Sequence, residues 1–407
     1  MPEYRTISIL DANCLTASGG GLSLAMESMA NGVCPAQESF AGYLPKGNRG
    51  VPIYRIPDQN FRVSTKIGKM DRSSVLAFAA AQPLFPIIQS LLPIIGKDNF
   101  GIFHGTSRGP VLKNLEAFEM WKNDRNRPNF AVDLPLASTA GVLGSHLKST
   151  GPSLTISATC CSGAHALVEA AAAIQCGRLD AALVVASEAA IHPSVLGQMQ
   201  LAGMLANYSG DPSRACIPFD SERTGTCLGE GAAAVLICNS NLSVPCKPLG
   251  RLTGWDASTD PFSRTLSHPA GSSLLNSMTR SLKMAGLEPG DLDYISPHGT
   301  GTVFNDNLEK SAFEKLFHSA PMKRYPLVIP TKHYTGHCLG ATSLIEVCFI
   351  LALLNSTDKA PAIPSLNYLN HPILDQNFFI PNQPGFNAAL SISLGFWGNI
   401  NSLVFVK

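Results

Sequence analysis

Charged residues are scarce in this sequence. They make up 14% of its 407 residues, and the 30 Lys and Arg nearly balance the 29 Asp and Glu. An average soluble protein carries roughly 25% charged residues, so disorder, a coiled coil and a polyelectrolyte are all disfavoured. The net charge of +1 gives wholesale nucleic-acid binding no electrostatic basis. The hydrophobic content of 45% instead predicts a sizeable core, and the length suits two fused halves.

Paired cysteine motifs are also absent. The 11 cysteines form no C-x-x-C pair, so neither a zinc ribbon nor a disulfide framework is suggested. The start of the chain lacks the basic region and apolar stretch of a signal peptide, so we expect a cytoplasmic protein with reduced thiols. Residues 75–95 carry no charge and are long enough to span a bilayer. Because Pro83, Pro86 and Pro93 interrupt them, we prefer a buried helix followed by an apolar connection, and we expect no membrane span.

Short motifs recur along the chain in a constant order. The pairs are HGT at 104–106 and 298–300, GAHALVE at 163–169 and GATSLIE at 340–346, and LGEG at 228–231 and LGFWG at 394–398. Three pairs in the same order predict an internal duplication. We place the junction in the polar, proline-containing stretch 239–248.

Strand-like and helical runs alternate in both parts of the chain. Strands are expected at Ala181–Ala186, Leu327–Ile329 and Ala388–Ser393, and helices at Ser273–Ala285 and Ala341–Leu354. Such alternation predicts an α/β fold in which helices cover the sheets. Two copies of it would stack as sheet, helix and sheet layers.

The candidate nucleophile lies in the segment TCCSG at 159–163, between a strand-like run and a helix that opens near Gly163. At a helix N-terminus a cysteine lies at the positive end of the helix dipole, so its thiolate is favoured. A sharp strand-to-helix junction also exposes the sulfur. Taken alone, the pair Cys160-Cys161 fits two small core residues better.

Two histidines also follow strand-like runs. His298 opens HGTGT, and His337 closes TKHYTGH just before a helix, where the dipole disfavours imidazolium and leaves a neutral ring. Lys332, in the second motif, reads alone as a surface charge. One cysteine and two histidines at strand ends together predict a site for acyl chemistry. Their spacing does not suggest a metal site, and a Cys–His–Asn hydrolase would need only one histidine.

At these residues the sequence resembles the β-ketoacyl-acyl carrier protein synthases, type II condensing enzymes of the thiolase superfamily. The ordered motifs are KMDR at 69–72, CCSGAH at 160–165, PFDSERTG at 218–225, LGEG at 228–231, HGTGT at 298–302 with Asp306 and Glu309, TK at 331–332, GH at 336–337 with Gly340 and Glu346, and GF at 395–396. The resemblance covers nearly the whole chain. It implies a thiolase-like duplicated α/β fold, layered helix–sheet–helix–sheet–helix, with two pseudo-equivalent halves. Residues 1–247 would carry the nucleophile, and residues 248–407 the two histidines.

The resemblance implies a role for each matching residue. Cys160 would be the nucleophile of a Cys-His-His site with His298 and His337, and Lys332 would organise the site electrostatically. The other implied residues are Phe396, whose N–H would join that of Cys160 in an oxyanion hole, Thr300 and Thr302 as pantetheine contacts, and Glu309 and Glu346 as supports for the lysine and the active-site loops. For the two glutamates, a helix-face or capping role fits the sequence equally well.

The implied reaction is a decarboxylating Claisen condensation. An acyl-enzyme thioester would react with malonyl-acyl carrier protein, giving 3-oxoacyl-acyl carrier protein and CO₂, in fatty-acid-like or specialised polyketide or polyene biosynthesis. The carrier protein supplies the phosphopantetheine, and no metal or bound cofactor is required. The expected assembly is a homodimer or a heterodimer with a homologous chain-length-factor-like subunit.

Two alternatives stay open. The chain could be an acyltransferase or hydrolase of the same superfamily that uses Cys160 without condensation, which Lys332 and the two histidines disfavour. It could also be a chain-length-factor-like partner without activity, which Cys160 disfavours.

The closing loop departs from the family pattern. The family usually has GFGGTN where residues 395–400 read GFWGNI, so Trp397 replaces a glycine beside Phe396, which looks like the gate of the acyl pocket. A bulky residue there should stiffen or reshape the gate. We therefore expect a specialised synthase rather than one for housekeeping fatty-acid elongation.

A basic docking surface is expected because carrier proteins are acidic. The sequence offers two groups of cations, which fit simple solvation equally well: Arg62, Lys66 and Lys69, and Lys122, Arg125 and Arg127.

Overall fold

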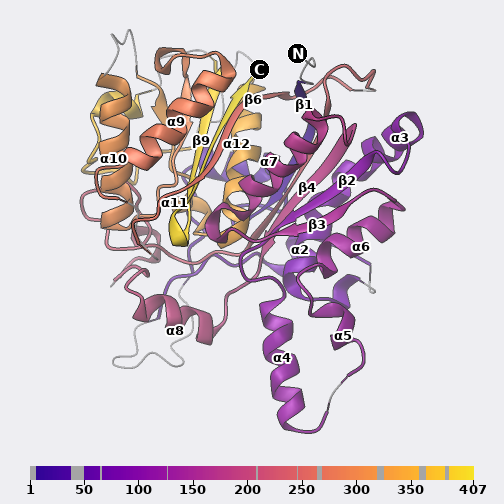
Figure 1. Cartoon of the computed structure of the whole chain (residues 1–407). Coiled ribbons are helices and arrows are strands. Elements are labelled where there is room, and N and C mark those ends of the chain that lie inside the picture. The colour runs from indigo at the N-terminus through magenta and orange to yellow at the C-terminus, as the bar shows by residue number, and fades with distance from the viewer. Residues whose placement is uncertain are drawn as a thin grey trace.

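Ten strands form one mixed sheet in the computed structural model, which describes residues 6–37, 50–64, 67–125, 127–207, 210–244, 246–263, 268–318, 325–356, 364–380 and 385–407. The strand order is β3-β2-β4-β5-β1-β6-β10-β9-β7-β8 (Figure 1). The strands are β1 (Ile7–Leu15), β2 (Phe100–Gly105), β3 (Ser153–Ile156), β4 (Ala181–Glu188), β5 (Gly231–Asn239), β6 (Gly250–Thr259), β7 (Tyr294–Ser296), β8 (Leu327–Val328), β9 (Ala388–Leu394) and β10 (Asn399–Val406).

The strand order reads the same from both ends, which reflects the duplication. From one end of the sheet the first half reads β3-β2-β4-β5-β1, and from the other end the second half reads β8-β7-β9-β10-β6. If the strands of each half are numbered along the chain, both orders are third, second, fourth, fifth and first. The second strand is parallel to the third and fourth in each half, and the remaining pairs are antiparallel. Among the described strands, the short β1–β6 pairing, over three residues of each strand, is the one that joins the halves within the sheet. The expected duplicated α/β fold is confirmed, while the boundary at 247 and 248 stays a prediction.

Helices complete five layers. Two buried clusters lie on the outer faces, one joining α2, α3 and α6 to the first-half strands and one joining α9 and α10 to the second-half strands. A third cluster fills the space between the strands of the first half and those of the second half, around α7 and α12. The helices are α1 (Leu22–Ala30), α2 (Arg72–Ala81), α3 (Phe85–Ile95), α4 (Val111–Lys122), α5 (Phe130–Asp133), α6 (Ser138–Leu147), α7 (Ser162–Gln175), α8 (Pro193–Leu201), α9 (Ser272–Ala285), α10 (Val303–His318), α11 (Lys332–Thr335) and α12 (Thr342–Leu354).

The two central helices explain the position of the functional residues. In α12 every residue but Ala352 is buried, as expected for a largely apolar helix that is covered by strands of both halves. Each central helix follows a 3-10 turn, Thr159–Cys161 before α7 and Leu339–Ala341 before α12. This places Cys160 opposite Gly340 in the duplication. The sequence match of Gly163 to Gly340 was therefore out of register by three residues, and His337 does not occupy the place equivalent to Cys160.

The uncharged segment before β2 forms two helices. Residues 72–95 are apolar and long enough to cross a membrane by length and composition, but 67% of the most apolar window is buried inside the protein. The predicted buried helix is α2, which packs against β4 and β5. The predicted apolar connection is wrong, because α3 continues the segment as a helix. Pro86 lies in the first turn of α3, where the missing N–H needs no partner.

Candidate active site

Cys160 lies in the 3-10 turn that leads into α7. The turn enters with Thr159 in the left-handed region, at φ 53°, which bends the chain sharply after β3. Cys160 is 7% exposed and lines a cavity of about 410 Å³. The Sγ of the fully buried Cys161 lies instead 3.4 Å from the backbone oxygen of Asn399. Only the first of the two adjacent cysteines therefore faces the cavity.

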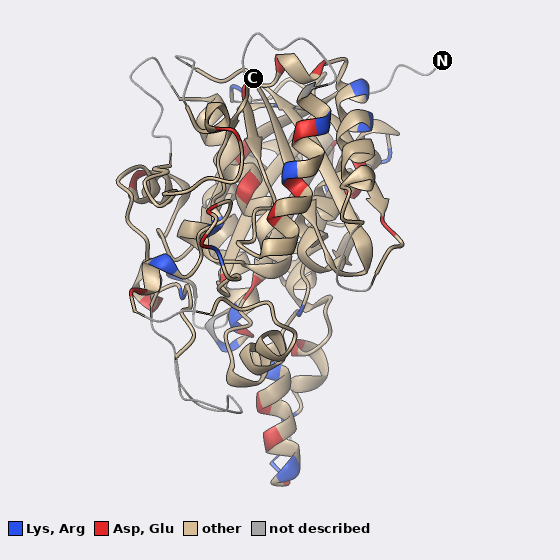
Figure 2. Cartoon of the chain, turned by 90° about the vertical axis from the view of Figure 1, so that its left-hand side faces the viewer, with Lys and Arg blue, Asp and Glu red and all other residues tan. Residues whose placement is uncertain are grey.

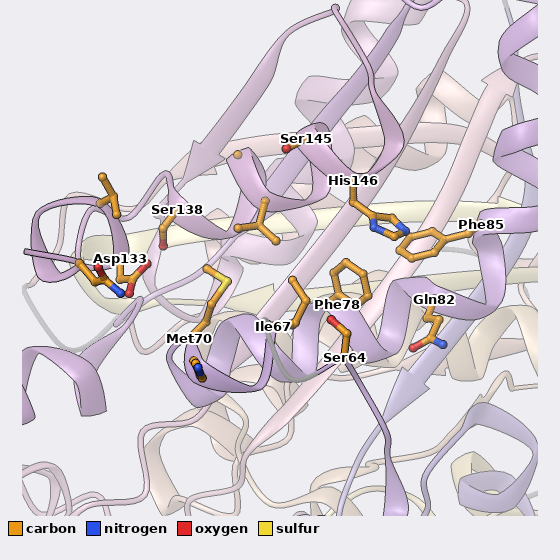
Figure 3. Close-up of a pocket in the computed structure, with 15 residues that line it drawn as sticks. Ser64, Ile67, Met70, Phe78, Gln82, Phe85, Asp133, Ser138, Ser145 and His146 are labelled. Carbon is orange, nitrogen blue, oxygen red and sulfur yellow. The ribbon is translucent and has the colours of Figure 1, made fainter.

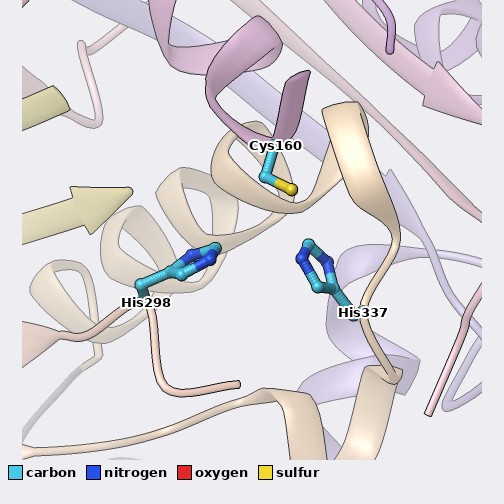
Figure 4. Close-up of side chains that lie close together, drawn as sticks. All are labelled: Cys160, His298 and His337. Atoms are coloured by element: carbon cyan, nitrogen blue, oxygen red, sulfur yellow. The ribbon is translucent and has the colours of Figure 1, made fainter. Parts of the chain in front are cut away.

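The structure brings both predicted histidines to this sulfur. His298 comes from the loop after β7, and His337 from the turn between α11 and the 3-10 turn before α12. One nitrogen of each ring and the Cys160 Sγ lie within 4.8 Å of one another. The ring centroids are 5.4 Å apart and the rings nearly perpendicular, at 83°, and Figure 4 shows both rings directed toward the sulfur. These residues are 138 and 177 positions beyond Cys160 in the sequence, so only the folded chain assembles them.

Both rings are held neutral. Burial lowers the pKa of His337 to about 3, and burial together with the Lys332 charge holds the pKa of His298 well below its usual range. The Nδ1 of His337 accepts from the Leu339 N–H at 3.1 Å, which leaves the ring proton on Nε2. The Nδ1 of His298 is buried with no partner among the described residues. His337 is thus a fixed donor, whereas the proton of His298 is not fixed by a hydrogen bond.

Burial also decides the state of the nucleophile. It raises the pKa of the Cys160 thiol to about 12, although the Lys332 charge acts in the opposite direction. A helix N-terminus stabilises a charge by about 2 kcal/mol at most, which corresponds to roughly 1.5 pH units. This is too little to offset the burial. The expectation that the free site favours a thiolate is therefore wrong, because the dipole argument left out desolvation.

Lys332 is fully buried behind the histidines. Its Nζ donates to the Glu346 Oε1 at 2.7 Å and to the backbone oxygen of His298. Glu346, on α12, also accepts from the Thr331 hydroxyl at 3.3 Å. The lysine thus connects the second half's central helix to the loop that carries His298, and a surface position for Lys332 is excluded.

Glu309 holds the same loop from the other side. Its two carboxylate oxygens accept from the backbone N–H groups of His298 at 2.6 Å and Gly299 at 2.7 Å. Gly299 and Gly301 adopt φ values of 46° and 78°, which glycine reaches without strain. The alternative of a simple helix-face position is therefore excluded for both Glu309 and Glu346.

The remaining residues with implied roles line the cavity. The hydroxyls of Thr300 and Thr302 are 2.9 Å apart, and both residues and Phe396 face the cavity. The first N–H groups of a helix have no partner within it. Among the described backbone groups, the N–H donors of Cys160 and Phe396 have no acceptor outside their short helices. Two such donors from residues that line the same cavity fit an oxyanion hole, a role that stays a prediction.

Trp397 does not line this cavity. Its side chain is 61% exposed, and its backbone adopts φ 62° and ψ 23°. A left-handed conformation costs a non-glycine residue roughly 1–2 kcal/mol. The restricted backbone at Trp397 therefore constrains the loop that carries the neighbouring Phe396.

The predicted docking cations differ in their surroundings. Arg62 and Lys69 are exposed, whereas Lys66 lies outside the described residues. Acidic residues accompany the second group on and after the projecting helix α4 (Figure 2). There Lys122 lies 3.4 Å from Glu119 and Arg127 lies 3.6 Å from Glu116, while Arg125 is exposed. The first group is thus the better candidate for a basic surface.

The grouping of Cys160, His298 and His337 also resembles a set of metal ligands, which their sequence spacing did not suggest. Their ligand atoms are up to 4.8 Å apart. Atoms that share a tetrahedral zinc ion lie about 3.3–3.6 Å apart, given bond lengths near 2.0–2.3 Å. The arrangement therefore fits a nucleophile with two donors better than a metal centre.

Sequence reasoning missed one wall of the cavity. Ser107 and Arg108, in the turn after β2, line it beside Cys160. The turn is held by Glu188 at the end of β4, whose Oε1 accepts from the Thr106 hydroxyl at 3.0 Å, from the Arg108 N–H at 3.0 Å and from the Ser107 N–H. The available signal was the position of this turn directly after a strand-like run, a position at which only cysteine and histidine had been predicted to be functional.

A larger hollow of about 920 Å³ lies elsewhere, beside α2, α5 and α6. Its inner wall carries the clustered rings of Phe78, Phe85 and His146, whose centroids are 4.8–5.3 Å apart (Figure 3). It contains neither the nucleophile nor the two histidines. The smaller cavity is therefore the candidate active site.

Known proteins place the chain in a family. The models for the N-terminal and C-terminal domains of β-ketoacyl synthases match residues 39–242 and 249–366. A 3-oxoacyl-[acyl-carrier-protein] synthase 2 of Synechocystis sp. is 29% identical over 350 residues, covering 83% of this chain and 82% of that protein.

Solved structures share the fold at lower identity. A ketosynthase in complex with its chain length factor, from Xenorhabdus doucetiae, has a TM-score of 0.83 at 21% identity and covers 100% of this chain and 99% of that one. A ketosynthase in complex with a type II polyketide acyl-carrier protein has a TM-score of 0.82 at 20% identity, with 100% of both chains covered.

Proposed function

The chain belongs to the β-ketoacyl synthase family, and from that premise we propose that it is a decarboxylating condensing enzyme acting on carrier-bound thioesters. The observation that carries the proposal is the position of the Cys160 sulfur, which faces two neutral histidines within 4.8 Å. Curated relatives named 3-oxoacyl-[acyl-carrier-protein] synthase support the same activity.

The first half-reaction acylates Cys160. The sulfur attacks the carbonyl carbon of an acyl thioester, and the N–H groups of Cys160 and Phe396 stabilise the developing oxyanion. Because burial keeps Cys160 as a thiol, its proton must leave during the attack. His298 accepts it, since the tautomer of this ring is not fixed, and passes it to the departing pantetheine sulfur. The products are an acyl-enzyme and a free carrier thiol.

The second half-reaction forms the carbon–carbon bond. A malonyl thioester enters, and the two histidines donate to its thioester oxygen. The carboxylate leaves as CO₂, and the enolate carbon attacks the acyl carbonyl on Cys160. Collapse of the intermediate breaks the carbon–sulfur bond, and Cys160 regains a proton from solvent. Neutral rings suit this step because the donated proton stabilises the enolate without being lost.

A transferase or hydrolase without condensation remains the enzymatic alternative. It requires the nucleophile but not a second histidine donor or the buried Lys332–Glu346 pair. A chain-length-factor-like partner without activity requires no nucleophile in the cavity, so Cys160 argues against it.

We propose an acyl carrier protein as the substrate-bearing partner, docking near Arg62 and Lys69. A related fold in complex with a carrier protein supports this partner class. The carrier supplies the phosphopantetheine, so the chain needs no bound cofactor. We also propose that the protein is located in the cytoplasm, together with the carrier protein on which it acts.

We further propose assembly with a second copy or a homologous chain-length-factor-like subunit. Several exposed apolar side chains occur in residues 118–154, and β3, within this range, forms one of the two end strands of the sheet. These side chains are Phe118, Trp121, Val132, Leu136 and Leu154. A sheet edge flanked by apolar surface favours pairing with another chain.

A specialised polyketide- or polyene-like chain is the proposed product class. The closing loop with Trp397 in a left-handed conformation supports this choice, as does structural similarity to polyketide ketosynthases.

Release of CO₂ tests the function. The protein is incubated with acyl-carrier and malonyl-carrier thioesters, and both CO₂ and the 3-oxoacyl product are measured by mass spectrometry. Condensation requires both products in equal amounts. Acylation or thioester hydrolysis without CO₂ would instead support the transferase or hydrolase alternative.

A further inference from the structure

The turn after β2 presents a single cation to the active-site cavity. Arg108 is the one side chain among the described lining residues that is charged at neutral pH. The other lining groups include thioethers, leucines, phenylalanines, hydroxyls, the Asn305 amide, the Cys160 thiol and the two neutral histidines. A guanidinium in such surroundings recognises carboxylates through paired N–H donors.

Among the described residues, no side chain or backbone group hydrogen-bonds to this guanidinium, although its charge acts to lower the pKa of Glu188. No side-chain hydrogen bond or ion pair within 4.0 Å connects it to another described residue. Glu188 lies behind the turn, but one of its oxygens is occupied by Thr106 and the backbone of Ser107 and Arg108. Burial also raises the pKa of Glu188 to about 7, so it offers less than a full negative charge at neutral pH.

The turn is fixed in place, which gives Arg108 a defined position. The Thr106 hydroxyl accepts from the Gly109 N–H at 3.0 Å, and Gly109 adopts a φ of 61°. Gly340 allows the close approach, because a Cβ there would lie 2.5 Å from the Ser107 nitrogen. Arg108 therefore stands beside the 3-10 turn before α12, close enough to Cys160 for its charge to oppose the rise that burial causes in the pKa of that thiol.

We propose that Arg108 binds a substrate carboxylate inside the active-site cavity, so that the enzyme takes a dicarboxylic thioester at this position. The inference rests on the proposed function, which supplies the thioester substrates. Thr300 and Thr302, on the opposite half, are the expected pantetheine contacts, so the carboxylate belongs to the acyl part. Its source is either a short dicarboxylic acyl group destined for Cys160 or the malonyl extender.

Binding of unreactive analogues tests the proposal without requiring turnover. Amide-linked glutaryl-, malonyl- and pentanoyl-pantetheine are titrated into the full chain by calorimetry, comparing the wild type with Arg108→Met and Arg108→Lys. Glutaryl and pentanoyl have the same number of carbons and differ in the terminal carboxylate. Arg108→Met keeps the bulk of the side chain, and Arg108→Lys keeps its charge.

The expected result is selective. Arg108→Met weakens binding of the glutaryl or the malonyl analogue by about 10- to 100-fold, the range for hydrogen bonds to a charged group. Pentanoyl binding changes by less than about twofold. Arg108→Lys keeps the charge but not the paired N–H donors, so it loses less affinity than Arg108→Met without matching the wild type. Loss with glutaryl alone identifies the acyl group as the source, and loss with malonyl alone identifies the extender.

Three results would overturn the inference: equal loss for all three analogues, no loss for either carboxylated one, or a wild type that does not prefer a carboxylated analogue to pentanoyl. A wild type that binds the carboxylated analogues but neither acylates Cys160 nor releases CO₂ would contradict the proposed function and leave the binding role of Arg108 standing.

Discussion

Desolvation governs the chemistry of single residues in this site. Cys160, His298 and His337 are all buried, and in each case burial is the largest cause of a pKa shift toward the neutral form. The cysteine and the two histidines are thus all neutral, with the buried Lys332–Glu346 ion pair nearby, and do not form a thiolate–imidazolium pair. Attack by Cys160 must be coupled to proton transfer, which the free Nδ1 of His298 allows.

The raised thiol pKa predicts a steep pH dependence for Cys160. A neutral alkylating agent reacts with the thiolate only, and with a pKa near 12 the thiolate fraction rises about tenfold for each pH unit up to pH 10. We expect the alkylation rate to rise in the same way from pH 7 to pH 9.5. Peptide mass spectrometry separates Cys160 from the exposed Cys176, and Cys160→Ala provides the blank. A plateau near neutral pH would contradict the neutral-thiol account.

The sequence allowed the chemical residues to be predicted but not their electrostatic state. The roles of Cys160, His298, His337 and Lys332 could be predicted because each residue follows a strand-like run in a recognisable motif. Their pKa shifts depend on burial by residues distant in the sequence, which no local pattern reports. Arg108 was missed for a similar reason, since its neighbours give no motif and only the folded turn directs it into the cavity.

The left-handed backbone conformation of Trp397 leads us to expect an effect on the acyl gate at Phe396. Trp397→Gly removes the restriction on a residue with φ 62°, whereas Trp397→Ala removes the indole and keeps the restriction. Because the indole is exposed, we expect Gly, but not Ala, to change the relative rates of Cys160 acylation across saturated chain lengths. Unchanged relative rates in the glycine variant would exclude the loop as a determinant of chain length.

Contacts between elements set the geometry of the site. The Lys332–Glu346 pair connects α11 to α12, and Glu309 on α10 holds the loop after β7. The sequence predicted most of these elements, but it placed α12 three residues out of register with α7 in the duplication. The sequence alignment followed the local similarity of GAHALVE and GATSLIE. The correct register depends on the 3-10 turns before the two helices, which only the structure reveals.

The buried pair predicts a large loss of stability when one partner is removed. Lys332→Met leaves the Glu346 carboxylate buried without a counter-ion, which typically costs about 3–5 kcal/mol. The double variant Lys332→Met with Glu346→Gln removes the uncompensated charge and should recover most of that loss. Urea denaturation of the wild type and both variants measures the difference. Equal stability of the single and double variants would contradict the pairing.

The duplication gives the whole molecule its open edges. Matching strand orders in the two halves leave β3 and β8 at the ends of the sheet. Alternating sequence patterns predicted two α/β halves, but not the short β1–β6 pairing, because a contact of three residues on each strand leaves no period in the sequence.

If the chains assemble through β3, a charged residue at position 154 should disrupt the assembly. Leu154 is 45% exposed on this edge, and a lysine there discourages strand pairing. We expect Leu154→Lys to reduce the assembly to single chains in light scattering, whether the partner is a second copy or a homologous subunit. Leu201→Lys on α8 is the control, because Leu201 is 77% exposed and distant from the edge in sequence. An unchanged mass for Leu154→Lys would exclude this edge.

Intact-protein mass after incubation with a panel of acyl-carrier thioesters tests the central claim most directly. Wild-type protein should gain the mass of one acyl group, and Cys160→Ala should gain none. Subsequent addition of malonyl-carrier should remove the acyl group and release CO₂. A folded wild-type protein that gains no acyl group with any thioester, alone or with its homologous partner, would contradict the assignment of Cys160 as the nucleophile of a condensing enzyme.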